Sequence, residues 1–243
     1  MRMSNVLGAI RAFLYYAGFY PVTVVWATLC LVFARLLPFK PRFYFVTAVN
    51  NFYIVWLRVC CGVSVNVRGR EHLPKEGAFV AISNHQSEWE TIYFQLLIQP
   101  QVVVLKQELL KIPFFGWALA LLEPIALDRS QRRGALKQLL EQGKSKLSAG
   151  VPVLVFPQGT RLPVGELGKW NKGGAMLAAS SAVPLVAIAH NAGRFWPGKG
   201  FVKHSGTVDV VISEPIATVD RTVDEIHKES VAWLEQQLTD IRA

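Results

Sequence analysis

Residues 78–90 read AFVAISNHQSEWE, and this stretch determines how the rest of the chain is organised. The apolar run Ala78–Ser83 is typical of a buried strand, and the periodic segment Thr91–Ile98 predicts a helix. His85 and Glu90 therefore stand at a strand-to-helix junction, where α/β folds place their chemistry.

On both sides of this junction, short apolar runs alternate with amphipathic segments. Helical patterns cover Gln131–Ser148 and Gly174–Ser181, and the capping box Thr222–Glu225 begins a last amphipathic helix. This alternation predicts an α/β fold with a mostly parallel central sheet flanked by helices. Besides the strand before His85, we expect strands at Val63–Arg68, Val102–Leu105, Pro124–Leu127, Val151–Phe156, Leu185–Ala189 and Thr207–Ile212.

The N-terminal segment is apolar enough to contact a membrane. Residues 12–34 carry no charge, and this run is long enough to span a bilayer. Pro21 would kink or split such a helix. A second apolar stretch, Phe43–Leu57, is interrupted by two asparagines and is too short to span comfortably. We therefore divide the chain into N-terminal membrane-anchoring helices at 1–58 and an α/β domain at 59–243.

Several arrangements of the N-terminal segment remain open. A single span and a pair of helices embedded in one leaflet both fit its length. Basic residues on both sides of the apolar run favour the embedded pair, because both ends then face the cytoplasm. A cleaved signal peptide is disfavoured, since the run is too long and no small-x-small site follows. A buried pair of core helices does not explain the positive charge.

Charge and hydropathy indicate a membrane surface as a partner. Apolar residues make up 51% of the chain and charged residues 18%, and the mean hydropathy is +0.29. The formal net charge is +9, and residues 1–75 hold nine basic residues against one acid, while the remainder is nearly balanced. A basic excess confined to an apolar segment favours an anionic phospholipid membrane over nucleic acid.

The cysteines indicate the cellular compartment of the protein, and the lack of metal motifs bears on whether it uses a metal. The three cysteines form no disulfide framework, which indicates a reduced protein exposed to the cytosol. The sequence contains neither CxxC nor HExxH, so we predict no metal and no other cofactor. We expect the protein at the inner, cytoplasmic membrane, with its α/β domain facing the cytoplasm.

The spacing of His85 and Glu90 constrains their geometry. On one continuous helix, five residues correspond to about 500°, so the two side chains would point about 140° apart. They can meet only if His85 lies in the turn before the helix. Ser87 and Glu90 form a capping-box pattern that would begin the helix at Ser87, so Glu90 could orient His85, cap the helix, or do both. In a true pair, the carboxylate fixes the histidine tautomer, and the other ring nitrogen takes a proton from an attacking hydroxyl.

Three further strand ends carry polar or basic residues. Gly159 permits a close backbone approach, and Thr160 and Arg161 offer a hydroxyl and a planar set of donors that suits phosphate. Lys106 and Arg129 follow two other strands. Each residue alone could be a solvated turn residue. Because the carboxyl ends of parallel strands meet at one edge of a sheet, we expect these groups to converge with His85.

Two weaker signals complete the candidates. The basic segment 169–174, KWNKGG, could form a flexible loop that lines the entry of an acidic substrate. His190 and Asn191 directly follow the strand Leu185–Ala189 and are a weaker site candidate.

Four motifs together resemble those of the glycerolipid acyltransferases, most closely the lysophosphatidate acyltransferase subgroup. Asn84–Glu90 looks like their H-x4-D/E motif, and Lys106–Gly116 resembles the second motif. Phe156–Arg161 is similar to F-P-E-G-T-R, and Val183–Val186 is similar to the late V-P-hydrophobic motif. All four occur in the order that the family has.

This resemblance implies a reaction and assigns residues to it. The reaction is transfer of a fatty acyl group from acyl-CoA or acyl-carrier protein to the sn-2 hydroxyl of lysophosphatidate, which makes phosphatidate. His85 would be the general base, with Glu90 as its partner. Arg161, with Lys106, would bind the substrate phosphate, beside a hydrophobic tunnel for the acyl chain. With the strand-end residues added, the candidate substrate-binding residues are Lys106, Arg129, Gln158, Gly159, Thr160 and Arg161.

The chain departs from the family pattern at two positions. Glu90 stands where aspartate is commoner, so its contact with His85 must span one more methylene. Gln158 replaces the usual glutamate, which leaves a hydrogen-bonding role and removes a negative charge. The acceptor could also be another lysolipid or glycerol 3-phosphate. A membrane lipid-binding protein without catalysis is the alternative from another class, and the His85–Glu90 pair disfavours it.

Overall fold

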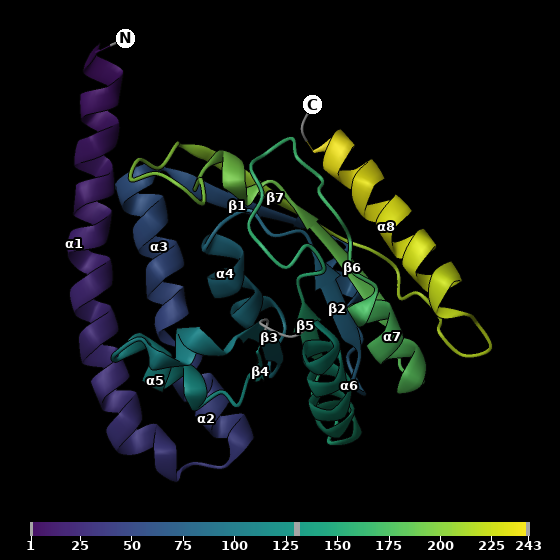
Figure 1. Ribbon diagram of the computed structural model, residues 1–243. Coiled ribbons are helices and arrows are strands. Elements are labelled where there is room, and N and C mark those ends of the chain that lie inside the picture. Colours follow the sequence, from purple (N-terminus) through teal and green to yellow (C-terminus); the bar gives the residue numbers. More distant parts are fainter. Residues whose placement is uncertain (1, 129–131, 242–243) are drawn as a thin grey trace.

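The computed structural model describes residues 2–128 and 132–241, and this part of the chain has the expected α/β fold (Figure 1). All seven predicted strands are present in one sheet, in the order β1-β7-β6-β2-β5-β3-β4. Their bounds are β1 (Val63–Arg68), β2 (Val80–Ser83), β3 (Val102–Lys106), β4 (Ile125–Leu127), β5 (Val153–Val155), β6 (Leu185–His190) and β7 (Gly206–Ile212).

Five strands of the sheet run in the same direction. β6, β2, β5, β3 and β4 pair in parallel, whereas β7 pairs antiparallel with β6 and parallel with β1. The sheet is therefore mostly parallel, as the sequence predicts. The carboxyl ends of the five parallel strands meet at one edge, and this places the turns after them side by side.

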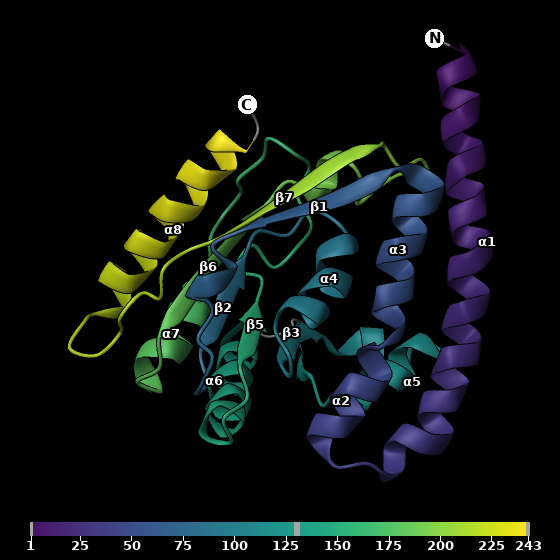
Figure 2. The same ribbon diagram turned by 180° about the vertical axis from the view of Figure 1, so that it is seen from behind.

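Helices cover both faces of the sheet (Figures 1 and 2). α6, α7 and α8 pack on one face, and α4 and the N-terminal helices pack on the other. Strands β2, β5 and β6 are buried along their whole length, as expected for a parallel sheet covered on two sides. The helices are α1 (Arg2–Phe33), α2 (Phe39–Thr47), α3 (Val49–Cys61), α4 (Trp89–Leu97), α5 (Phe115–Ala120), α6 (Arg132–Ser148), α7 (Gly173–Ser180) and α8 (Val223–Asp240). Short 3-10 turns lie at η1 (Ala34–Leu36), η2 (Arg70–His72), η3 (Gln107–Lys111) and η4 (Ala192–Arg194).

Local sequence signals account for the ends of several helices. The capping box before α8 forms as predicted: Thr222 Oγ1 accepts from the backbone N–H of Glu225 at 3.3 Å, and Glu225 accepts from the N–H of Thr222 at 2.8 Å. Of the two effects expected of Pro21, a kink or a split, the split does not occur, because α1 continues through this residue. Tertiary contacts hold this part of α1 against α3, where the Trp56 indole N–H donates to the carbonyl of Tyr15.

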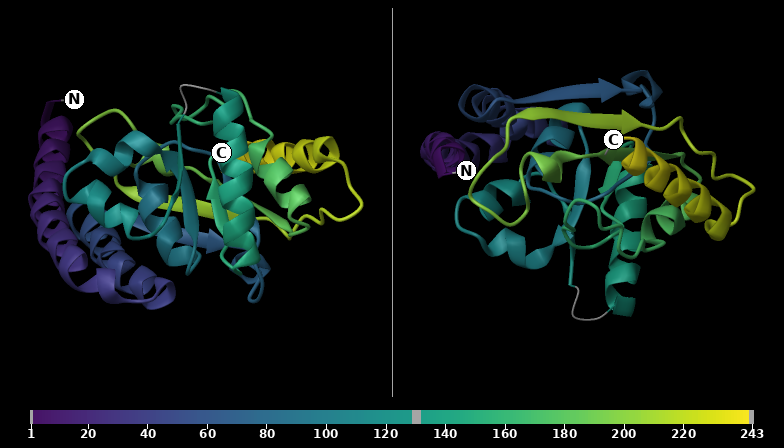
Figure 3. Two further views of the ribbon diagram at one scale, coloured as in Figure 1. Left: turned by 60° about the horizontal axis from the view of Figure 1, so that its bottom comes forward. Right: turned by 90° about the horizontal axis from the view of Figure 1, so that it is seen from above.

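The N-terminal helices form a hairpin along one flank of the sheet, on the opposite side of the molecule from α8 (Figures 2 and 3). The segments Val6–Leu36 and Phe39–Cys61 are both long and apolar enough to cross a membrane. The second segment was therefore underestimated at Phe43–Leu57, because its helices extend farther at both ends. The division of the chain near residue 58 stays a prediction.

The hairpin is neither a buried core pair nor detached from the core. Only 17% of the most apolar window of Val6–Leu36 is buried, and Phe13, Val25 and Leu36 are strongly exposed. Tyr15, however, is fully buried and belongs to the core that α3, α4 and the sheet share. The hairpin thus has one face against the α/β domain and one apolar face directed outward.

Candidate active site

The turns after three neighbouring strands meet at one cavity of about 1150 Å³. β2 leads into His85, β3 ends at Lys106, and β5 leads into the turn that holds Gly159, Thr160 and Arg161. All five of these residues line the cavity, so the expected convergence is present in the structure. Arg129, the remaining predicted member, lies outside the described residues.

His85 and Glu90 contact each other directly. Nδ1 of His85 lies 2.8 Å from Oε1 of Glu90, whose side chain is fully buried. His85 stands in the turn before α4, as the five-residue spacing requires. A carboxylate only accepts hydrogen bonds, so Nδ1 carries the ring proton and Nε2 keeps a free lone pair.

Glu90 both orients His85 and holds the turn before α4. Its Oε1 also accepts from the backbone N–H groups of Gln86 and Ser87, each at 2.8 Å. The helix begins at Trp89 rather than at Ser87, and Glu88 stands at its N-cap without a side-chain cap hydrogen bond. The contacts of Glu90 therefore lie before the helix, and the predicted capping box at Ser87 is wrong. Burial opposes the charge on Glu90, but the hydrogen bonds from His85 and Ser87 outweigh it and lower the pKa of this carboxyl.

His190 lies behind the pair and ties β2 to β6. Its backbone N–H donates to Asn84 Oδ1 at 3.0 Å, and Asn84 Nδ2 donates to the carbonyl of His190 at 2.9 Å. His190 Nδ1 accepts from the N–H of Ala192, so Nε2 carries the proton and donates to the carbonyl of Asn84. Burial lowers the pKa of His190, and the fully buried ring therefore supports the junction as a neutral group.

Gln158 and Phe156 fix His85 from the β5 side. The backbone N–H of His85 donates to Gln158 Oε1 at 2.7 Å, and Gln158 Nε2 donates to the carbonyl of Leu167 at 2.7 Å. The Phe156 ring stacks on the His85 ring with centroids 4.4 Å apart. Gly159 has φ +71°, a conformation that favours glycine in this turn. A glutamate at position 158 would be unable to donate to Leu167 when ionised.

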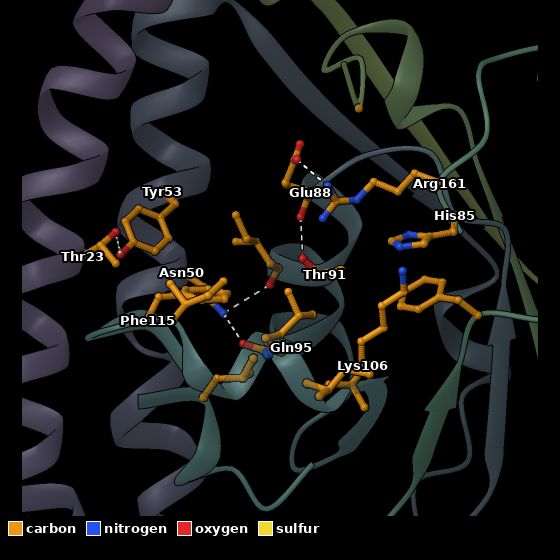
Figure 4. Close-up of a pocket in the computed structure, with 18 of the residues that line it drawn as sticks. Thr23, Asn50, Tyr53, His85, Glu88, Thr91, Gln95, Lys106, Phe115 and Arg161 are labelled. Atoms are coloured by element: carbon orange, nitrogen blue, oxygen red, sulfur yellow. Dashed lines mark hydrogen bonds and ion pairs between the residues drawn. The ribbon is translucent and has the colours of Figure 1, made fainter. Parts of the chain in front are cut away.

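The basic end of the cavity contains two predicted residues and two that the sequence did not single out. Arg161 forms an ion pair with Glu88, and Lys106 extends toward His85 (Figure 4). Arg194 and Lys199, from the segment after β6, also line the cavity. They were missed because they lie beyond the strand end, in a segment without a recognisable motif.

The rest of the cavity is apolar and reaches the N-terminal hairpin. This wall was not predicted, since helix α1 lies far from the motifs in the sequence. It is the part of the structure that corresponds to the expected hydrophobic tunnel. The lining residues of this wall include Phe19, Trp26, Tyr53, Ile92, Phe115 and Leu119.

The basic segment 169–174 does not line the cavity, so that prediction is wrong. Trp170 is buried and donates to Glu235 of α8 at 3.0 Å, and Lys172 pairs with Asp224 at 2.6 Å. Contact with α8 therefore holds this segment away from the site. In the part of the chain that the structure describes, no group of three or more His, Cys, Asp and Glu side chains could hold a metal ion. The expectation that no cofactor is needed stays a prediction.

Known proteins resemble this chain in sequence and in fold. The profile of the acyltransferase family matches residues 64–191. A 1-acyl-sn-glycerol-3-phosphate acyltransferase of Pseudomonas aeruginosa is 44% identical over 243 residues, covering 98% of this chain and 94% of that protein. A protein of the same name from Saccharomyces cerevisiae is 34% identical over 182 residues, covering 72% of this chain and 58% of its own.

A solved structure shows the same fold over the whole chain. The crystal structure of the 1-acyl-sn-glycerophosphate (LPA) acyltransferase PlsC from Thermotoga maritima matches with a TM-score of 0.81 at 23% identity. The match covers 100% of this chain and 98% of that one. From the family profile and the full-length relative, the chain belongs to the acyltransferase family and is an acyltransferase.

Proposed function

We propose that this enzyme transfers a fatty acyl group from a thioester, acyl-CoA or acyl-carrier protein, to the sn-2 hydroxyl of 1-acylglycerol 3-phosphate and so makes phosphatidate. One observation carries the proposal: the His85–Glu90 pair opens into a cavity that has basic side chains at one end and an apolar wall at the other. An acceptor with a phosphate head and an acyl tail is likewise charged at one end and apolar at the other. The names of the relatives agree with this substrate.

His85 is the general base in this proposal. Its Nε2 takes the proton of the sn-2 hydroxyl while the hydroxyl oxygen attacks the thioester carbonyl carbon. The tetrahedral intermediate then collapses, the C–S bond breaks, and the proton passes from His85 to the leaving thiolate. Glu90 stabilises the imidazolium between these two steps, and Phe156 holds the ring plane. No covalent acyl-enzyme is required.

The basic residues anchor the acceptor's phosphate. Arg161 presents a planar guanidinium and Lys106 a mobile ammonium, and both line the cavity beside His85 (Figure 4). Gly159 and Thr160 bring the backbone and a hydroxyl of the β5 turn to the same end of the cavity. We assign Arg129 to this phosphate site because it follows the predicted strand Pro124–Leu127, whose carboxyl end lies at the same edge of the sheet.

The hairpin gives the enzyme a membrane surface. Its outward face exposes Phe13, Val25 and Leu36, and the nearby η3–α5 region exposes Phe114 and Trp117. Both ends of the hairpin lie at the same end of the molecule (Figures 1 and 2), which supports a pair of helices embedded in the cytoplasmic leaflet. Lysophosphatidate and acyl chains would then enter directly from the lipid.

The test is an acyl-transfer assay on the purified full-length protein in phospholipid vesicles. We expect phosphatidate from lysophosphatidate with at least one of two donors, oleoyl-CoA and oleoyl-acyl-carrier protein. Glycerol 3-phosphate and lysophosphatidylethanolamine, supplied as acceptors at equal concentration, should react much more slowly. Product from neither donor would refute the proposed function, and faster reaction of either competing acceptor would refute the assignment of lysophosphatidate.

A further inference from the structure

Glu88 is the one acidic side chain among the described residues that line the cavity, which also holds Lys106, Arg161, Arg194 and Lys199. Glu88 Oε1 lies 2.5 Å from Nη1 of Arg161, and each side chain is 39% exposed. Figure 4 shows this ion pair beside His85. A carboxylate thus pairs with the guanidinium that the acceptor's phosphate needs.

The contacts of Glu88 leave its carboxylate free to move. Its backbone carbonyl is fixed at the start of α4, where it accepts from the N–H of Thr91 at 3.2 Å and from Thr91 Oγ1 at 2.7 Å. The carboxylate, in contrast, has Arg161 as its sole hydrogen-bond partner within the described chain, and Lys203 is the other cation close enough to attract it. A change of side-chain rotamer would release Arg161 without breaking any other hydrogen bond.

The stem of Arg161 lies beside Gly198, where a Cβ added to the glycine would be 3.4 Å from Arg161 Cδ and 2.8 Å from the carbonyl oxygen of Gln86. The head of Arg161 pairs with Glu88, so the carboxylate could act by orienting the guanidinium or through its charge. The two roles differ in sign. Loss of an orienting group raises the KM for the acceptor, and loss of a competing charge lowers it.

We propose that Glu88 is a competing counter-charge, which pairs with Arg161 and is displaced by the phosphate of the acceptor. The inference rests on the proposed function and adds a specificity determinant to its acceptor site. A phosphate monoester carries about −1.5 to −2 charge and three acceptor oxygens, so it can displace one carboxylate. Glu88 then weakens the binding of lysophosphatidate, and it weakens the retention of phosphatidate, which carries the same phosphate.

The test compares wild type with Glu88→Gln, which keeps the shape of the side chain and removes its charge. Because exposed ion pairs contribute little, the KM for lysophosphatidate should fall about twofold to fivefold. Inhibition by phosphatidate should strengthen by the same factor. Both differences should narrow between roughly 0.01 and 1 M salt, over which the Debye length falls from about 30 to about 3 Å.

A second variant and a matched control separate charge from structure. Glu88→Ala removes the acceptor to which Arg161 donates, and it should also lower the KM for lysophosphatidate. Glu166→Gln removes one negative charge from an exposed position in the same loop as Arg161, outside the cavity lining, and should leave this KM unchanged. Calorimetric titration of hexanoyl-lysophosphatidate without an acyl donor should show the same order of affinities.

Three results would overturn the role of Glu88. If both Glu88 variants are active and their KM for lysophosphatidate is unchanged, Glu88 has no effect on acceptor binding. If that KM is raised in both, Glu88 supports Arg161 instead of competing with the phosphate. Neither result would contradict acyl transfer to lysophosphatidate. An equal decrease in KM for Glu166→Gln would show that the decrease comes from the net charge of the protein and not from the position of Glu88. Absence of transfer by the wild type refutes the proposed function instead, so the two failures are distinct.

Discussion

Replacing Glu90 with glutamine tests how the buried carboxylate supports His85. The amide oxygen of the substituted side chain can still accept from the N–H groups of Gln86 and Ser87, both 2.8 Å from Oε1 in the wild type. The fold should therefore survive, at a cost of about 1–2 kcal/mol for replacing charge-assisted hydrogen bonds with neutral ones. The negative charge that stabilises a protonated His85 is lost.

The structure sets an upper limit on the decrease in kcat that follows from losing this charge. Two unit charges 2.8 Å apart, the distance between His85 Nδ1 and Glu90 Oε1, attract by about 6 kcal/mol at an effective dielectric constant of about 20. This attraction sets a ceiling of about 10⁴-fold, since 1.36 kcal/mol corresponds to a factor of ten in rate. We expect kcat to fall by about 10²- to 10⁴-fold.

The assay is phosphatidate formation at saturating lysophosphatidate and oleoyl-CoA, with thermal denaturation of each protein as the check on folding. The KM for lysophosphatidate should change little, because Glu90 is buried and does not line the cavity. A folded Glu90→Gln variant with wild-type kcat would refute the assignment of Glu90 as the partner of His85 and leave it only the support of the turn before α4.

Three further predictions follow from single contacts. Arg161→Ala should raise the KM for lysophosphatidate about tenfold or more and change kcat little, because it removes a binding interaction that the ground state and the transition state share. An unchanged KM would show that Arg161 does not belong to the phosphate site. Gln158→Glu should lower the free energy of unfolding by about 1–3 kcal/mol, because an ionised carboxylate cannot donate to the carbonyl of Leu167. A protonated glutamate restores the donor, so an equal loss of stability at pH 5 and at pH 8 would contradict this reason. Burial lowers the pKa of Lys203 from 10.5 to about 8, so between these two values the unfolded chain holds a proton on this residue that the folded chain has lost. The free energy of unfolding of the wild type should therefore rise with pH relative to that of Lys203→Met, and a difference between the two proteins that stays constant from pH 8 to pH 10 would refute this source.

Features set by local sequence were predictable. The strands β2 to β6 are short apolar runs, β1 and β7 have polar residues between the apolar ones, and the capping box at Thr222 places the start of α8 correctly. The five-residue spacing alone required His85 to lie off the helix, and the 2.8 Å contact with Glu90 agrees with this requirement. The parallel sheet then brings Lys106 and Arg161 to the same edge.

Features set by long-range packing were not predictable. Glu88 and Arg161 are 73 positions apart, and nothing in either segment indicates that they pair. The wall that α1 contributes to the cavity depends on how the hairpin docks, which hydropathy does not encode. Pro21 gave a misleading signal for the same reason, because contacts between α1 and α3 override its local preference.

The most direct test of the central claim is the rate of phosphatidate formation by wild type and His85→Ala, measured side by side in the same vesicles. The backbone of His85 bonds to Gln158 and Leu162 without using the ring, so the variant should fold and bind membranes as the wild type does. We predict that kcat falls by about 10²- to 10⁴-fold. A folded His85→Ala protein that makes phosphatidate at the wild-type rate would contradict the proposed mechanism.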